Sequence, residues 1–126
     1  MAPIQASAAR LVRSTPRPRE PRRLIDAGAA VALATDFNPG TSPTMSLPLV
    51  MALGVSQLGL RHAEALTAVT VNAAAALGLA GERGQLAPGF MADLVLTAVA
   101  DWREAAYWMG ANVVSAVWTA GSACPA

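Results

Sequence analysis

The chain has 126 residues, of which 54% are hydrophobic and 13% are charged, and its formal net charge is +1 at pH 7. This composition is too apolar for a chain that is disordered throughout, and the length allows one modest hydrophobic core. A complete eight-stranded α/β barrel takes roughly 200 residues or more, so this length excludes one.

The first 23 residues differ in charge from the rest of the chain. They contain six arginines and one acid, Glu20, whereas the remainder contains three arginines and seven acids. They lack aromatic side chains for stacking on bases and a sustained amphipathic pattern, so residues 1–23 are expected to be a disordered Arg/Pro-rich head. A transit-like or nucleic-acid-binding arm, and sequence that comes from an altered start or frame, are the alternatives.

A helix-to-strand step follows the head. Residues 24–28, Leu-Ile-Asp-Ala-Gly, are typical of a helix end closed by a glycine. The apolar run that follows, 29–36, predicts a strand buried on both faces of a parallel sheet and ending at Asp36. Catalytic and ligand-binding residues of α/β enzymes lie at the carboxyl ends of strands, so Asp36 is a candidate site residue. An aspartate that opens an Asx-turn is an equally simple interpretation.

The loop after this strand is rich in Pro, Gly, Ser and Thr. Asn38 offers amide donors and acceptors, and the glycine allows the backbone N–H groups around Gly40 and Thr41 to converge as an anion nest. An ordinary turn at Asn38-Pro39-Gly40 is the alternative.

Two helices are expected next. Ser46 is placed to cap the first, Pro48 lies in its first turn, and Gly59 ends it after about Leu58. The second, residues 62–77, is the clearest periodic element of the chain, and Gly78 follows it.

From Gly84 the pattern changes to short strands, predicted at 91–97 and 113–119. The glycine-rich stretch 78–84 lacks the strand before it and the helix after it that a nucleotide loop requires, so it is expected to be a linker. Three segments result: the head 1–23, an α/β segment 24–83 and a β segment 84–126.

Residues 35–44, Thr-Asp-Phe-Asn-Pro-Gly-Thr-Ser-Pro-Thr, resemble the last barrel strand and following loop of imidazolonepropionases. These are amidohydrolases that open the imidazolone ring in histidine breakdown. The resemblance continues through residues 47–51, 64–74, 84–86 with 89, and 92–95, and covers about the carboxyl-terminal quarter of such an enzyme. One departure is the start of helix 62–77, where relatives carry a capping Thr and then Pro but this chain has Arg61 and His62.

The resemblance implies an α/β fold: the last strand and helices of an amidohydrolase (β/α)8 barrel at 24–83, plus carboxyl-terminal strands of a small β-sandwich at 84–126, together an incomplete domain. It implies a metal-dependent hydrolase of a cyclic amide, which converts 4-imidazolone-5-propanoate to N-formimidoyl-L-glutamate. In such enzymes one zinc or iron ion is bound by a His-x-His pair, a further His and an Asp. Asp36 matches that last ligand, which is also catalytic, and Asn38, Gly40 and Thr41 match substrate-binding positions.

The other ligands are not found in the sequence. The single histidine, His62, begins a predicted helix and is expected at the surface, and the single cysteine, Cys124, lies in the terminal tail as an incidental thiol. A catalytic zinc takes about three protein ligands. The isolated chain is therefore expected to bind no metal tightly and to be inactive. Its open strand edges predict aggregation, a loosely packed helical state, or pairing with another copy or a complementary chain.

Two other functions stay open: a non-catalytic interaction module whose contact surface is the Arg-rich head, and a segment of another cyclic amidohydrolase. The apolar stretches 47–60 and 63–80 are too short or too polar to cross a bilayer. The head also lacks the apolar segment of a secretory signal. A cytoplasmic protein is expected, with a small-molecule substrate and neither a nucleic-acid partner nor a membrane partner.

Overall fold

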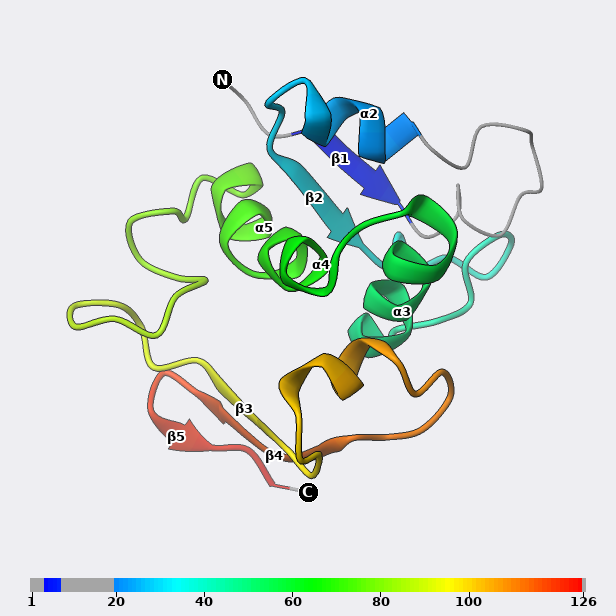
Figure 1. Cartoon of the computed structure of the whole chain (residues 1–126). Coiled ribbons are helices and arrows are strands. Elements are labelled where there is room, and N and C mark those ends of the chain that lie inside the picture. The colour runs from blue at the N-terminus through cyan, green and yellow to red at the C-terminus, as the bar shows by residue number, and fades with distance from the viewer. Residues whose placement is uncertain (1–3, 8–19, 126) are drawn as a thin grey trace.

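A computed structural model describes residues 4–7 and 20–125 of the chain (Figure 1). They form a two-stranded parallel sheet and a three-stranded antiparallel sheet, with helices between them, which confirms a mixed α/β architecture. The elements in chain order are β1 (Ile4–Ser7), α2 (Glu20–Asp26), β2 (Val31–Ala34), α3 (Leu47–Leu58), α4 (His62–Val69), α5 (Val71–Ala76), β3 (Leu94–Thr97), the short 3₁₀ helix η1 (Trp102–Ala106), β4 (Val114–Thr119) and β5 (Ser122–Ala123).

Strands β1 and β2 pair in parallel, from Ile4 opposite Val31 to Ser7 opposite Ala34. Because the pair is parallel, both strands end at the same edge of the sheet, and α2 belongs to the connection between them. The expectation of a disordered head at 1–23 is therefore wrong for Ile4–Ser7 and for the residues from Glu20 onward, because β1 pairs with the edge of β2 and α2 begins at Glu20. Residues 8–19 lie outside the described part of the chain.

The glycine-closed helix end is confirmed. Gly28 has a φ of +82°, and the Ala29 N–H donates to the Leu24 carbonyl at 2.9 Å. This geometry satisfies the last carbonyls of α2 and turns the chain directly into β2. The strand is shorter than the predicted 29–36, because the backbone leaves the extended conformation before Asp36, where φ is +49°.

The predicted caps of helix α3 are confirmed. The Ser46 hydroxyl accepts the Leu49 N–H at 3.2 Å, Pro48 lies in the first turn, and Gly59 closes the helix with a φ of +70°. Within the helix, a Cβ on Gly54 would lie 3.0 Å from the Leu33 side chain. The glycine thus allows α3 to pack closely on β2.

The predicted helix 62–77 is two helices, α4 and α5, which are separated at Thr70 (φ −118°, ψ −89°). The Thr70 hydroxyl donates to the Leu66 carbonyl at 2.7 Å, while the Thr70 N–H turns to the Thr67 carbonyl at 3.3 Å. A side-chain hydroxyl thus takes the acceptor that a continuous α-helix would give to the backbone. The periodicity of apolar residues does not reveal this competition between the Thr70 hydroxyl and the backbone N–H for the Leu66 carbonyl, so it predicted one continuous helix.

The start of α4 is also satisfied, although Arg61 offers no capping oxygen. The Glu64 carboxylate accepts the Arg61 N–H at 2.7 Å and binds the Arg22 guanidinium at 2.6 Å. Glu64 therefore caps α4 from its first turn and ties α4 to α2.

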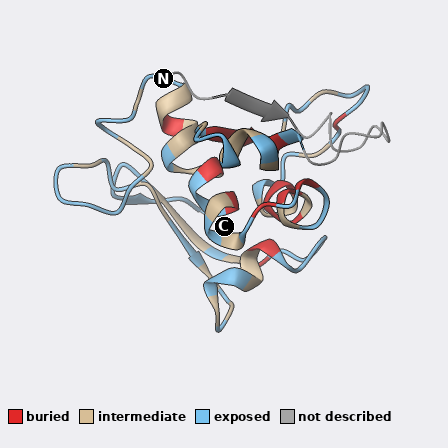
Figure 2. Cartoon of the chain, turned by 45° about the horizontal axis from the view of Figure 1, so that its top comes forward, coloured by how far each residue is buried: buried red, intermediate tan, exposed pale blue. Residues whose placement is uncertain are grey.

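The hydrophobic core lies between β2, α3, α4 and η1, where Leu33, Val50 and Ala65 are almost completely buried. Figure 2 shows the buried residues concentrated there, whereas β3, β4 and β5 are half-buried or exposed.

The strands predicted at 91–97 and 113–119 occur as β3 and β4, paired antiparallel, with β5 added beyond them. Membership of a β-sandwich stays a prediction. Among the described residues, no helix combines the length and the apolar character needed to cross a membrane.

Candidate active-site loop

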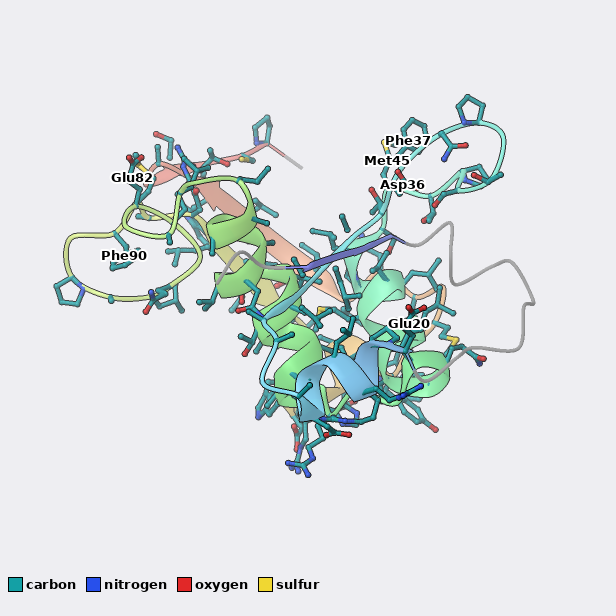
Figure 3. All side chains as sticks on the ribbon, turned by 90° about the horizontal axis from the view of Figure 1, so that it is seen from above. Glu20, Asp36, Phe37, Met45, Glu82 and Phe90 are labelled. Atoms are coloured by element: carbon teal, nitrogen blue, oxygen red, sulfur yellow. The ribbon has the colours of Figure 1, made fainter. Side chains whose placement is uncertain are left out.

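Asp36 follows the carboxyl end of β2, at the edge of the sheet where the parallel strands both end. Its backbone is left-handed, with a φ of +49°, and its side chain is exposed. Aspartate adopts this conformation more readily than most residues, yet it still costs roughly 1–2 kcal/mol. Figure 3 shows the loop from Asp36 to Met45 projecting away from the helices. Interactions inside the loop must therefore hold Asp36 in place.

The Asn38 side chain organises this loop. Its Nδ2 donates to the Asp36 carbonyl at 2.8 Å, and its Oδ1 accepts the N–H groups of Gly40 at 3.1 Å and Thr41 at 2.8 Å. The Thr41 hydroxyl donates to the same oxygen at 3.1 Å. The amide group of one residue thus joins Asp36, Gly40 and Thr41 into one hydrogen-bonded unit.

The loop's own side chain occupies the predicted anion nest in this structure. The N–H groups of Gly40 and Thr41 do converge, but the oxygen on which they converge is Asn38 Oδ1. A short-range side-chain acceptor satisfies the turn, as asparagine does in Asx-type turns. Asn38, Gly40 and Thr41 are in direct contact, and Asp36 joins them through its backbone carbonyl.

Ser42 closes the base of the loop and was not singled out in the sequence. It is 1% exposed, and its hydroxyl donates to the Thr35 carbonyl at 2.6 Å. Asn38 and Ser42 also exchange backbone hydrogen bonds, at 3.0 and 3.3 Å. A serine in a loop rich in Pro, Gly and Thr gives no sequence signal of burial, because such residues are usually solvated.

The described residues do not form a metal centre by themselves. No group of three His, Cys, Asp or Glu side chains gathers anywhere within residues 4–7 and 20–125. His62 is the first residue of α4, and Cys124 is exposed near the end of the chain. Among these residues, Asp36 is not joined by two further side chains of the kinds that bind metals.

Two polar clusters outside the loop join structural elements. Arg22 links Glu64 of α4 to Asp26 of its own helix, and its hydrogen bond lowers the pKa of Glu64 below the usual range. Asp93 pairs with Arg83 and accepts the Ala120 N–H at 2.9 Å, and this backbone hydrogen bond is the main reason why the pKa of Asp93 is lowered. Both acids are occupied by partners within the fold.

An open cavity of about 210 Å³ lies between α2, β2, α4 and α5, and is lined by Ile25, Val31, Thr67 and Asn72 among others. It adjoins the start of β2, the end opposite to Asp36. The Asn72 Nδ2 donates to the Val31 carbonyl at 2.8 Å, and the lining is mostly apolar. The cavity is thus separate from the Asp36 loop.

Known proteins with similar sequences are imidazolonepropionases. The chain is 58% identical over 101 residues to that of Deinococcus deserti, 52% over 104 residues to that of Rubrobacter xylanophilus and 55% over 91 residues to that of Geobacillus kaustophilus. These matches cover 72–82% of the chain. The chain spans about a quarter of the length of these relatives (22–25%). The predicted resemblance to imidazolonepropionases is confirmed.

Two solved structures superimpose on most of the chain. An amidohydrolase from Thermotoga maritima superimposes with a TM-score of 0.61 and 27% identity, over 81% of this chain and 24% of that one. An adenosine deaminase from Xanthomonas campestris with bound zinc gives a TM-score of 0.67 at 24% identity, over 79% of this chain and 26% of that one. At this identity the deaminase shows a shared fold only.

The sequence profile of the amidohydrolase family matches residues 12–124, which include β2, the Asp36 loop and all the later elements. The Thermotoga maritima protein is also named an amidohydrolase. The chain belongs to the amidohydrolase family.

Proposed function

We propose that the chain supplies the Asp36 carboxylate and the substrate loop of an imidazolonepropionase, which hydrolyses 4-imidazolone-5-propanoate to N-formimidoyl-L-glutamate. The observation that carries this proposal is the 49–58% identity to imidazolonepropionases over 79–82% of the chain. Because the chain spans about a quarter of these relatives, the activity is assigned to an assembly that contains the rest of the site. We keep the cytoplasmic location expected from the sequence as part of this proposal.

Asp36 is the proposed proton-transfer residue. Hydrolysis adds the oxygen of water to the ring carbonyl carbon, breaks the C–N bond of the cyclic amide and delivers a proton to the departing nitrogen. An exposed carboxylate at the end of β2 is able to accept the proton of the attacking water and return it to that nitrogen. We also propose Asp36 as one ligand of a divalent ion, zinc or iron; the described residues do not supply the other ligands.

Asn38, Gly40 and Thr41 are the proposed substrate-binding residues. The two converging N–H groups already bind an oxygen acceptor, Asn38 Oδ1, at 3.1 and 2.8 Å. A substrate carboxylate oxygen is a stronger acceptor because it is charged. The propanoate group would therefore replace the Asn38 oxygen on the same N–H groups and release the Asn38 amide for its own contact with the substrate.

The proposal is tested by grafting residues 24–124 of this chain into the Deinococcus deserti imidazolonepropionase in place of the matching segment. The graft is expected to turn over imidazolone propanoate, and Asp36→Asn is expected to lower kcat at least about 100-fold, the usual share of a general acid–base group. Asp26→Asn, which changes an exposed carboxylate on α2, is the matched control and should leave kcat unchanged. A folded graft without activity, or an active Asp36→Asn graft, would refute the proposal.

A further inference from the structure

The hydroxyl of Ser42 does more than fill space at the base of the Asp36 loop. Ser42 is the one polar residue that is fully buried within the described part of the chain, at 1% exposure. A position that only required packing would be filled by an apolar side chain at lower cost, because a buried hydroxyl must find a partner. Here the partner is the Thr35 carbonyl, 2.6 Å away.

The Thr35 carbonyl belongs to the peptide plane that ends at the Asp36 nitrogen. The hydrogen bond from Ser42 to this oxygen fixes the orientation of that plane. The Asp36 φ of +49° is the rotation about the N–Cα bond relative to the same plane, so the hydrogen bond restrains the backbone on the N-terminal side of Asp36. On the other side of Asp36, the Ser42 backbone exchanges hydrogen bonds with Asn38 at 3.0 and 3.3 Å. Ser42 thus anchors the chain immediately before Asp36 and two residues after it.

We propose that Ser42 is a positioning residue, whose buried hydroxyl holds Asp36 in its left-handed conformation and so aims the carboxylate. The catalytic meaning of this role rests on the proposed function, but the clamp itself does not. The role needs a hydroxyl in particular: alanine leaves the Thr35 carbonyl without its donor, and cysteine has nearly the size of serine but is a weak donor.

The clamp is tested first on the 126-residue chain by amide hydrogen exchange measured with mass spectrometry. Both Ser42→Ala and Ser42→Cys are expected to speed exchange about tenfold in the peptide covering residues 36–45, in line with the loss of one hydrogen bond. Exchange in α3 and β4 is expected to stay unchanged. Ser56→Ala is the matched control, because it removes another hydroxyl bonded to a backbone carbonyl, that of Ala52, at 2.8 Å; it should leave residues 36–45 unaffected.

Three results of the exchange experiment would overturn the inference: unchanged exchange at 36–45 in Ser42→Ala, full protection in Ser42→Cys, or faster exchange throughout the chain. The last would show a general structural role. In the Deinococcus graft, both Ser42 variants are expected to lower kcat about tenfold or more, as for a displaced catalytic group, with KM changed less than about threefold. A rise in KM alone would also overturn it. An inactive parent graft together with local loss of protection would refute the proposed function and leave the clamp standing.

Discussion

Asp36 shows how a single residue depends on its neighbours for a conformation that it does not prefer. Its φ of +49° is held by Asn38 Nδ2, which binds its carbonyl, and by Ser42, which binds the carbonyl before it. The position of Asp36 after an apolar strand was readable from the sequence, because strands and polar loops differ in composition. The hydrogen bonds from the Gly40 and Thr41 N–H groups to Asn38 Oδ1 could not be predicted from the sequence, because the same residues also permit a nest that is open to a ligand.

Asn38→Ala in the Deinococcus graft is expected to raise KM about tenfold and to lower kcat less. The substitution leaves the Gly40 and Thr41 N–H groups without the acceptor that makes them converge. Substrate binding must then order the loop, which lowers affinity. Steady-state kinetics with imidazolone propanoate check this. Asn112→Ala, which removes a local side-chain acceptor near β4, is the control and should leave KM unchanged. A fall in kcat with an unaltered KM would contradict the prediction.

At the scale of elements, the caps of α2 and α3 follow from Gly28, Ser46 and Gly59, since capping chemistry is local. The break at Thr70 does not follow from the periodicity of residues 62–77. Gly84 lies against that break: a Cβ there would be 2.9 Å from both the Thr70 carbonyl oxygen and the Ala74 Cβ. A contact between residues distant in sequence thus accompanies the kink.

Gly84→Ala is expected to lower the free energy of unfolding by about 2 kcal/mol or more, because it combines overpacking with a φ of +88°. Gly81→Ala is the matched control: nothing lies within 4 Å of its added Cβ, and its φ is outside the left-handed range. That variant should change stability by less than about 0.5 kcal/mol. Urea unfolding of the 126-residue chain measures both, and equal effects at the two positions would contradict the close approach at Thr70.

The Glu64 cap predicts a pH dependence. Arg22 lowers the pKa of Glu64 in the folded chain, so the stabilisation is fully present above the unfolded-state pKa and is lost as the pH falls through the folded-state pKa. Glu64→Gln is therefore expected to cost about 1 kcal/mol at pH 7. The difference from the unsubstituted chain should close as the pH falls below about 4.3.

Unfolding midpoints measured from pH 7 to pH 3 test this. Glu82→Gln changes an exposed carboxylate and serves as the control, which should leave the unfolding midpoint at pH 7 unchanged. A Glu64→Gln deficit that stays constant down to pH 3 would show that the charge of Glu64 contributes nothing to the cap.

At the scale of the whole molecule, the core cluster is built from β2, α3, α4 and η1 with the residues beside them, and many large apolar side chains of the described residues are exposed. Tyr107 is 65% exposed and Trp108 is 49% exposed, although their rings contact each other edge to face at 5.0 Å. Such surface is typical of an interaction face. Pairing with another copy or a complementary chain stays a prediction.

The pure 126-residue chain is expected neither to bind zinc tightly nor to hydrolyse imidazolone propanoate. The described residues bring together no three metal-ligating side chains, and one carboxylate cannot hold a catalytic zinc. Calorimetric zinc titration of the chain and of its Asp36→Asn variant should give the same weak binding. Stoichiometric zinc binding that is lost in Asp36→Asn, or measurable turnover, would contradict this.

The sequence by itself determined the family, the strand before Asp36, the capped helices and the first two strands of the antiparallel sheet, because these depend on local composition, periodicity and sequence motifs. Tertiary structure decided what depends on contacts between separated residues. It paired β1 with β2, joined α2 to α4 through Arg22 and Glu64, and buried Ser42 beneath the loop. Each of these satisfies a backbone or side-chain polar group with a partner that no local pattern reveals.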